Sequence, residues 1–300
     1  MKKLMKLLLV GALLAMLPGL ASAQPSAHYV PGVEGIKGSS LPPPGVYVKD
    51  YNVFYFADRL NDSNGDEIVG PDPKAFIYAN VPRVIWITDK KVLGGFLGLD
   101  ALIPLQYTSL EFNDGGGGRP KFSTFGVGDL FAEATLSWHV DQADFAIAYG
   151  AWAPTGDEAT DSDPSKPGAG FWTHMLTAGM TWYMDPEKKW ALSALNRYEI
   201  NHEKRDTDWT PGQVWTLEAG LSYAVSKTVD VGVAGYYQQQ ITDNDPKGDS
   251  TKGKVLAIGP EIVMLCPKLG IFTSIRYNYE VLSEARLQGH TVALTFTKRL

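Results

Sequence analysis

Residues 214–225, VWTLEAGLSYAV, alternate between apolar side chains and polar or small ones along their whole length. Side chains on a β-strand point to opposite faces in turn, so this segment would have one apolar and one polar face. The same pattern recurs at residues 269–281, LGIFTSIRYNYEV, and at residues 190–202, WALSALNRYEINH. These three segments therefore predict long, amphipathic β-strands.

The chain contains about twelve segments of this kind, and most are longer than the five or six residues typical of soluble sheets. A tilted strand that crosses a membrane needs about 9 to 11 residues, so the length favours a membrane protein. Pro82 and Pro104 interrupt two segments, which leaves the boundaries of those strands soft. The predicted strands are 45–58, 75–88, 93–112, 124–138, 142–153, 171–184, 189–202, 212–226, 229–241, 254–265, 269–282 and 287–299.

The connections between these segments alternate in length from the first strand onward. The long ones are 59–74, 113–123, 154–170, 203–211, 242–253 and, less clearly, 283–286, and the short ones are 89–92, 139–141, 185–188, 226–228 and 266–268. Outer-membrane barrels have an even number of strands, tight periplasmic turns and longer outer loops. We therefore predict an all-β fold over residues 46–300, a transmembrane antiparallel up-and-down β-barrel of about twelve strands.

Tryptophans near the ends of the predicted strands fit an interfacial aromatic girdle. They are Trp86, Trp138, Trp152, Trp172, Trp182, Trp190 and Trp215. A soluble β-sandwich with ordinary core tryptophans remains the alternative at this point.

The first residues have the pattern of a cleaved signal peptide. Lys2, Lys3 and Lys6 precede a short apolar run at 7–17, and Ala-Ser-Ala at 21–23 has the form that signal peptidase cuts. We therefore expect residues 1–23 to be removed on export and the protein to reside in the outer membrane. The signal carries three of the 27 basic residues and none of the 33 acidic ones. The exported chain is thus strongly acidic, which argues against nucleic acid as a partner.

Residues 24–45 do not form a strand pattern. Pro31-Gly32 and Leu41-Pro42-Pro43-Pro44 predict an extended, polyproline-like segment, which we expect to begin on the periplasmic side. Our functional hypothesis is that this segment enters the barrel and acts as a plug. A loose periplasmic tail is the alternative.

Short motifs along almost the whole exported chain resemble the family named for the meta-pathway of phenol degradation. They are His28-Tyr29-x-Pro31-Gly32, Pro42-Pro43-Pro44-Gly45-x-Tyr47, Pro154-Thr155-Gly156-Asp157, Arg197-Tyr198-Glu199-Ile200-Asn201, Thr210-Pro211-Gly212-Gln213, Val231-Gly232-Val233-x-Gly235-Tyr236-Tyr237 and Ile258-Gly259-Pro260-Glu261. This resemblance implies an outer-membrane, transporter-like barrel that passes small hydrophobic or aromatic solutes in connection with aromatic catabolism.

Charged residues gather on the polar face of the predicted strands, which would line the barrel lumen if the apolar face meets lipid. Charges in that position must be paired or hydrated, because an unpaired buried charge is costly. A salt-bridged structural lining and a lining that shapes a solute path both remain open. The pore-lining candidates are Asp100, Asp129, Glu133, Arg197, Glu199, Glu218, Glu261, Arg276 and Glu280.

The sequence gives little support for a catalytic or metal-binding site. The five histidines, His28, His139, His174, His202 and His290, lack metal-ligand spacing, and the single cysteine, Cys266, excludes a disulfide framework. Ser274 and His290 lie on neighbouring predicted strands, but Ser274 falls on the inward-facing parity. We therefore predict no catalytic residue, no metal site and no cofactor.

The first interpretation is an outer-membrane channel for a small hydrophobic or aromatic solute, in contact with membrane lipid and lipopolysaccharide. The second is a non-conducting barrel with a structural or adhesive role, and the third is a lipid-acting outer-membrane enzyme.

Overall fold

The computed structural model describes residues 27–70, 72–113, 117–160, 162–246 and 252–300. The predicted signal peptide, 1–23, lies outside these ranges. Within them the chain forms strands and turns, and none of the described residues belongs to a helix that is long and apolar enough to cross a membrane. The strands are β1 (Gly45–Leu60), β2 (Lys74–Val92), β3 (Gly95–Leu102), β4 (Leu105–Glu111), β5 (Lys121–Val127), β6 (Leu130–Val140), β7 (Ala143–Ala153), β8 (Thr173–Tyr183), β9 (Trp190–Asn201), β10 (Val214–Ser226), β11 (Val229–Gln240), β12 (Lys254–Cys266), β13 (Ile271–Glu284) and β14 (Leu287–Arg299).

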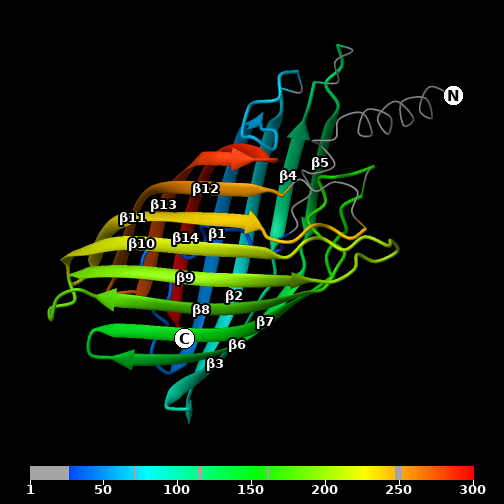
Figure 1. The fold of residues 1–300 in the computed structure, drawn as a ribbon. Helices are drawn as coiled ribbons and strands as arrows, with labels where there is room; N and C mark the ends of the chain where they lie inside the picture. The colour runs from blue at the N-terminus through cyan, green and yellow to red at the C-terminus, as the bar shows by residue number, and fades with distance from the viewer. Residues whose placement is uncertain (1–26, 71, 114–116, 161, 247–251) are drawn as a thin grey trace.

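The strands close into one antiparallel barrel (Figure 1). Neighbours in sequence pair from β6 to β14, β14 returns to pair with β1, and β1 pairs with β2. Two positions in the wall each hold two short strands, because β3 and β4 follow one another along the same edge of β2. β5 and β6 follow one another in the same way at the next position. The prediction of twelve wall strands is therefore confirmed, with two of them split.

Each split has a local cause in the backbone. Pro104, which has no N–H to give to a ladder, separates β3 from β4, and Gly128-Asp129 separates β5 from β6. Beyond these breaks β4 and β5 form a hairpin that extends past the rest of the wall (Figure 1). Among the described strands, β5 pairs only with β4. The predicted continuous strands 93–112 and 124–138 are wrong in this respect.

The two faces of the wall have opposite chemistry. Large apolar side chains are exposed on the outside, for example Phe125, Leu192 and Ile258, while Glu199 and Arg276 are buried inside. A soluble protein buries its apolar face, whereas a membrane barrel turns that face to lipid. The β-sandwich alternative therefore fails, and the fold is that of an outer-membrane barrel.

The predicted tryptophan girdle holds only in part. Trp86, Trp172, Trp182 and Trp190 are exposed on the outer surface. Trp152, in contrast, is 6% exposed and packs inside the barrel against Phe131. The position of Trp152 near a strand end in the sequence does not show whether its side chain faces lipid or the lumen.

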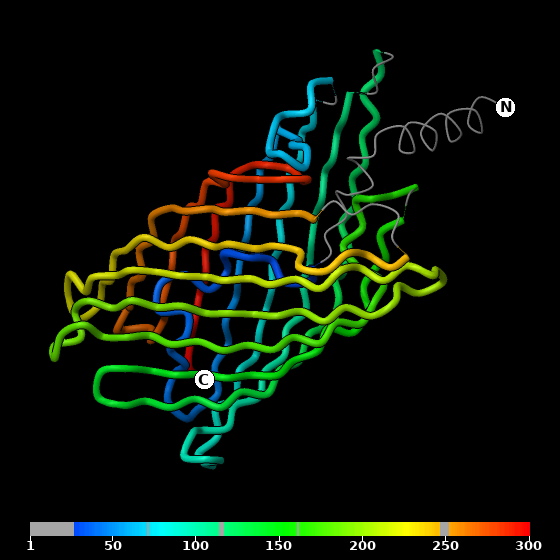
Figure 2. Tube along the Cα trace, viewed as in Figure 1, coloured from blue at the N-terminus to red at the C-terminus, as the bar shows by residue number. Residues whose placement is uncertain are grey.

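The N-terminal segment, residues 27–44, lies inside the barrel (Figure 2). Its first part, at His28, contacts Thr173 at the outer end of β8, and its last part reaches the opposite end, where Tyr47 donates to the carbonyl of Pro43. The described part of the segment therefore starts beneath the outer loops and ends at the periplasmic rim. The expectation that it begins on the periplasmic side is wrong for these residues.

Candidate functional site: the lumen and the segment inside it

Carboxylates of the wall hold the backbone of the N-terminal segment. The Glu199 carboxylate on β9 accepts hydrogen bonds from the backbone N–H groups of His28 and Tyr29, at 2.9 and 3.0 Å. The Glu218 carboxylate on β10 accepts from the Gly32 N–H at 2.7 Å and from the Tyr29 hydroxyl at 2.6 Å. Hydrogen bonds to a charged acceptor are stronger than neutral ones. These backbone N–H groups are thereby hydrogen-bonded, although the irregular segment is not paired with any β-strand.

A second anchor lies deeper in the lumen, between β12 and β13. The Glu261 carboxylate accepts the Ile36 N–H at 2.7 Å and forms a two-pronged ion pair with the Arg276 guanidinium, at 2.9 and 3.0 Å. Arg276 also donates to the carbonyl of Gly32. Both side chains of the pair are at most 2% exposed. This pair of opposite charges thus binds a donor and an acceptor of the segment at once.

Glu34 is the charged side chain that the segment places at the centre of the barrel. Its carboxylate lies 2.5 Å from the Lys49 ammonium, 3.0 Å from the Arg83 guanidinium and 3.7 Å from Arg197, and it accepts the Tyr51 hydroxyl at 2.8 Å. Burial raises the pKa of Glu34, but the neighbouring cations outweigh it and hold this pKa well below its usual range. Glu34 therefore stays ionised at neutral pH.

Arg83 joins this centre to two more wall carboxylates. Its Nε donates to Asp100 at 2.9 Å and its Nη2 donates to Glu133 at 3.2 Å. Asp100 on β3 and Glu133 on β6 are direct cross-strand partners, so two like charges face the same guanidinium. Three carboxylates, counting Glu34, thus share one buried Arg83.

Asp129 occupies the break between β5 and β6. Its carboxylate accepts the backbone N–H groups of Gly156 and Ala169, both at 2.8 Å, and lies 3.0 Å from Nε2 of His28. Burial raises the pKa of Asp129, but these hydrogen bonds hold it below its ordinary value. Asp129 therefore ties the loop between β7 and β8 to the start of the segment.

Aromatic side chains surround the same end of the segment. The His28 ring is stacked on Trp152, with ring centres 5.5 Å apart, and it meets the edge of Phe171 at 4.7 Å. The Tyr29 ring packs beneath the Arg197 guanidinium, 4.1 Å from ring centre to Cζ. The lumen beneath the outer loops is therefore lined by aromatic rings next to the carboxylates of Asp129 and Glu199.

Glu280 stands apart from the segment. Its carboxylate accepts the hydroxyls of Tyr55 and Tyr236, at 3.0 and 3.1 Å, and the backbone N–H of Gly289 at 2.6 Å. These partners belong to the wall, so Glu280 braces β1, β11 and β14 against β13.

All nine residues chosen from the sequence lie on the lumen side, and the structure joins most of them through the segment. The sequence argument missed five residues that complete the centre, because they lie on the segment or on strands with weak alternation. The missed residues are His28, Glu34, Lys49, Tyr51 and Arg83. Arg83 could have been identified from the sequence, because an arginine inside an otherwise apolar predicted strand needs a buried partner.

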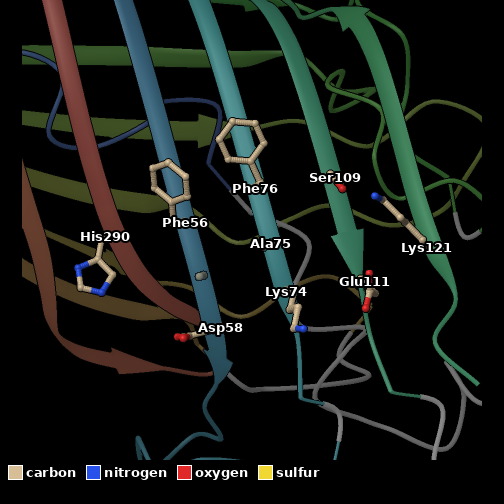
Figure 3. Close-up of a pocket in the computed structure, with 10 residues that line it drawn as sticks. Phe56, Asp58, Lys74, Ala75, Phe76, Ser109, Glu111, Lys121 and His290 are labelled. Atoms are coloured by element: carbon tan, nitrogen blue, oxygen red, sulfur yellow. The ribbon is translucent and has the colours of Figure 1, made fainter. Parts of the chain in front are cut away.

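A hollow of about 390 Å³ lies on the outer face near the outer ends of β1, β2, β4 and β5 (Figure 3). Phe56 and Phe76 form its apolar part, with ring centres 5.2 Å apart. Charged side chains lie to one side of them in Figure 3, towards the strand ends, namely Asp58, Lys74, Glu111 and Lys121. An apolar floor with a charged rim suits the boundary between lipid chains and head groups.

The arrangement offers no support for a Ser–His pair. The Ser274 hydroxyl donates to Glu261 in the lumen at 2.6 Å, whereas His290 lies on the outside and is 2.6 Å from the Tyr277 hydroxyl. In the described part of the chain, no group of three or more His, Cys, Asp and Glu side chains is placed to hold a metal ion.

Comparison with solved structures places this barrel among outer-membrane channels in fold. An outer membrane channel from Pseudomonas putida F1 superimposes with a TM-score of 0.74 at 15% sequence identity, over 91% of this chain and 100% of that one. The translocator domain of the autotransporter NalP from Neisseria meningitidis gives a TM-score of 0.50 at 13% identity, over 88% and 91%. The Ralstonia pickettii toluene transporter TbuX gives 0.45 at 9% identity, over 89% and 92%.

Curated proteins give no significant match to the sequence. A family model does match, and it spans residues 57–296, which is most of the barrel. The chain therefore belongs to the family described as "Putative MetA-pathway of phenol degradation".

Proposed function

We propose that this protein is an outer-membrane channel for small hydrophobic or aromatic solutes, and that residues 27–44 are its plug. The observation that carries the proposal is that the segment, which continues directly into β1, lies in the lumen and places two aromatic rings, His28 and Tyr29, beneath the outer loops. A twelve-stranded barrel lies between filled eight-stranded barrels and wide porins, so one segment is enough to obstruct it.

The chemistry of the lumen favours small solutes with an aromatic ring over large polar ones. Trp152, Phe131 and Met175 form a buried apolar cluster with Tyr29 at the outer end. Below this cluster, charged side chains of the wall are paired with one another in buried ion pairs, such as that of Glu261 with Arg276. The family name and the channel from Pseudomonas putida F1 support the same class of function.

The proposal includes contact with lipid and lipopolysaccharide and no enzymatic activity. The outer hollow at Phe56 and Phe76 provides an apolar surface at the level of the strand ends. Ser274 and His290 lie on opposite sides of the wall, which removes the one arrangement that supported a lipid-acting enzyme.

The decisive experiment compares the full protein with a variant in which residues 25–40 are replaced by a Gly-Ser linker of equal length. Both proteins are extracted, tested for heat-modifiable gel mobility and inserted into planar bilayers. We expect small or rare conductance steps from the full protein and larger steps from the linker variant. Equal conductance in both would contradict the plug.

Solute class is tested separately with liposomes. We expect phenol and toluene to enter liposomes that contain the full protein faster than protein-free ones, with no matching gain for glucose. The network around Glu34 favours a second candidate, a permanently closed structural barrel, because its ion pairs are buried and mutually satisfied. No conductance from either variant and no solute entry would support that candidate instead.

A further inference from the structure

We propose that the His28 ring occupies a binding site for a neutral, hydroxylated, single-ring aromatic compound, and that an incoming compound of this class competes with His28 for it. The inference rests on the proposed function, because it names the solute class and the first site that this solute would meet. The site is defined by Trp152, Phe171, Thr173 and Asp129, and we call it the ring slot.

The ring slot is shaped for one flat ring. Trp152 lies nearly parallel to the His28 ring, with an angle of 14° between the planes, and Phe171 meets that ring edge-on at 71°. Stacked and edge-on contacts are the two favourable arrangements for aromatic rings. A benzene ring would keep both contacts in the place of the imidazole.

The polar end of the ring slot calls for a hydrogen-bond donor. Asp129 keeps the backbone N–H groups of Gly156 and Ala169 whether or not His28 is present, but it loses one donor when the imidazole leaves. A buried carboxylate that loses a donor is penalised, so a replacement that donates there is favoured. A phenolic hydroxyl is such a donor.

The surroundings also select against an anionic compound. Asp129 is joined near the His28 backbone by Glu199, whose Oε2 is buried and has no hydrogen-bond partner among the described residues. A carboxylated aromatic would bring a further negative charge next to the Asp129 carboxylate. Trp152 Nε1 is likewise buried without a partner in the described part of the chain, so the ring slot also contains an unused hydrogen-bond donor.

The position of His28 permits a local exchange. His28 lies at the end of the segment that is farthest from β1, while Gly32, Glu34 and Ile36 are held independently by Glu218 and Glu261. The imidazole can therefore leave the ring slot while the lower part of the segment stays anchored. The side chain of His28 is only 4% exposed when docked, so it excludes other occupants from the slot.

The test measures binding of phenol, by calorimetry, to the full-length exported protein in detergent. The variants are His28→Ala, His28→Ala combined with Trp152→Leu, and His139→Ala as a matched control at the periplasmic end of β6. We expect His28→Ala to bind phenol at least about tenfold more tightly than the wild type and the control, since it no longer pays for displacing the imidazole. The double variant should lose this gain, and benzoate should not replace phenol.

Heat-modifiable mobility verifies that each variant is folded. Equal affinity of phenol for the wild type and His28→Ala would overturn the inference, as would a gain that survives Trp152→Leu or that extends to benzoate. Phenol entry into liposomes separates this result from the proposed function. Entry without a binding gain in His28→Ala overturns the ring slot and leaves the channel, whereas a binding gain without entry supports the slot and overturns the channel.

Discussion

The guanidinium of Arg83 donates a hydrogen bond of 3.0 Å to the carboxylate of Glu34, and this contact joins the barrel wall to the segment inside it. Arg83 also donates to the wall carboxylates Asp100 and Glu133, and Glu34 is also paired with Lys49. The contact between Arg83 and Glu34 therefore links the ion pairs of the wall to the segment, so docking of the segment and stability of the wall are coupled.

Replacing Glu34 with Gln should loosen the segment. The substitution keeps the shape of the side chain but leaves Lys49 and Arg83 without the anion between them. Breaking a buried ion pair from one side costs about 3–5 kcal/mol, and part of this cost should fall on docking. We expect larger or more frequent conductance steps in planar bilayers for Glu34→Gln than for the wild type.

The matched control is Lys37→Gln. Lys37 is also on the segment, but its pair with Asp230 is partly exposed, with side chains 23% and 25% accessible. Such pairs contribute about 0–1 kcal/mol, so the conductance should stay near that of the wild type. Equal effects of the two substitutions would mean that the pairing of Glu34 does not hold the segment.

Acid should release the segment. The pKa of Glu34 lies below its ordinary value of 4.5 in the docked state, and that of Asp129 lies below its ordinary value of 3.8. A depressed pKa contributes stability that is complete above the ordinary value and is lost as the pH falls towards the lower, docked value. We expect conductance to rise below about pH 4.

The linker variant that lacks residues 25–40 provides the control for this titration. It has no Glu34, so its conductance should not rise in the same acidic window. A wild-type conductance that rises on alkalinisation instead would contradict this account, because ionised Glu34 and Asp129 hold the docked state.

Gly35 offers a way to displace the segment without changing a charge. Its φ is +66°, a region that favours glycine, and a Cβ built there would lie 2.1 Å from Oε2 of Glu261 and 2.4 Å from Nη2 of Arg276. We expect Gly35→Ala to raise conductance while leaving the heat-modifiable mobility of the barrel unchanged. The control is Gly38→Ala, where the closest atoms would be 3.1 Å away, and a similar rise in that variant would argue against a specific steric effect.

The regular strands show what alternation alone can predict. On β9, β10 and β13 the parity of the sequence places Arg197, Glu218 and Arg276 inside, and all three side chains are buried in the structure. These strands alternate cleanly because one face meets lipid and the other meets a polar lumen. Sequence spacing could not show that the partners of these side chains come from a segment that is far away in the chain.

The first two strands show why alternation failed there. Asp50 and Asn52 on β1 and Asn80 on β2 point outward, where their side chains hydrogen-bond to one another at 2.9 to 3.2 Å. Tyr51, between two of them, points inward to Glu34. Because polar side chains face lipid and an aromatic side chain faces the lumen, the sequence of these two strands does not alternate between apolar and polar residues. Only the pairing of strands reveals that the outward side chains satisfy each other.

Arg276 and Glu261 should show that a buried pair is more costly to break than to replace. Each side chain is at most 2% exposed, so Arg276→Met leaves an unpaired carboxylate in the lumen and removes the donor to the Gly32 carbonyl. We expect Arg276→Met to lower the free energy of unfolding by about 3–5 kcal/mol, measured by urea titration of the barrel in lipid vesicles.

Replacing both residues by Met should cost less than this single change, because no buried charge is then left alone. The exposed pair of Arg119 with Asp72 provides the comparison, and Arg119→Met should leave the free energy of unfolding nearly unchanged. If the double Met variant were as unstable as Arg276→Met alone, the unpaired carboxylate of Glu261 would not be the source of the cost, and loss of the Arg276 donor to the Gly32 carbonyl would have to account for it.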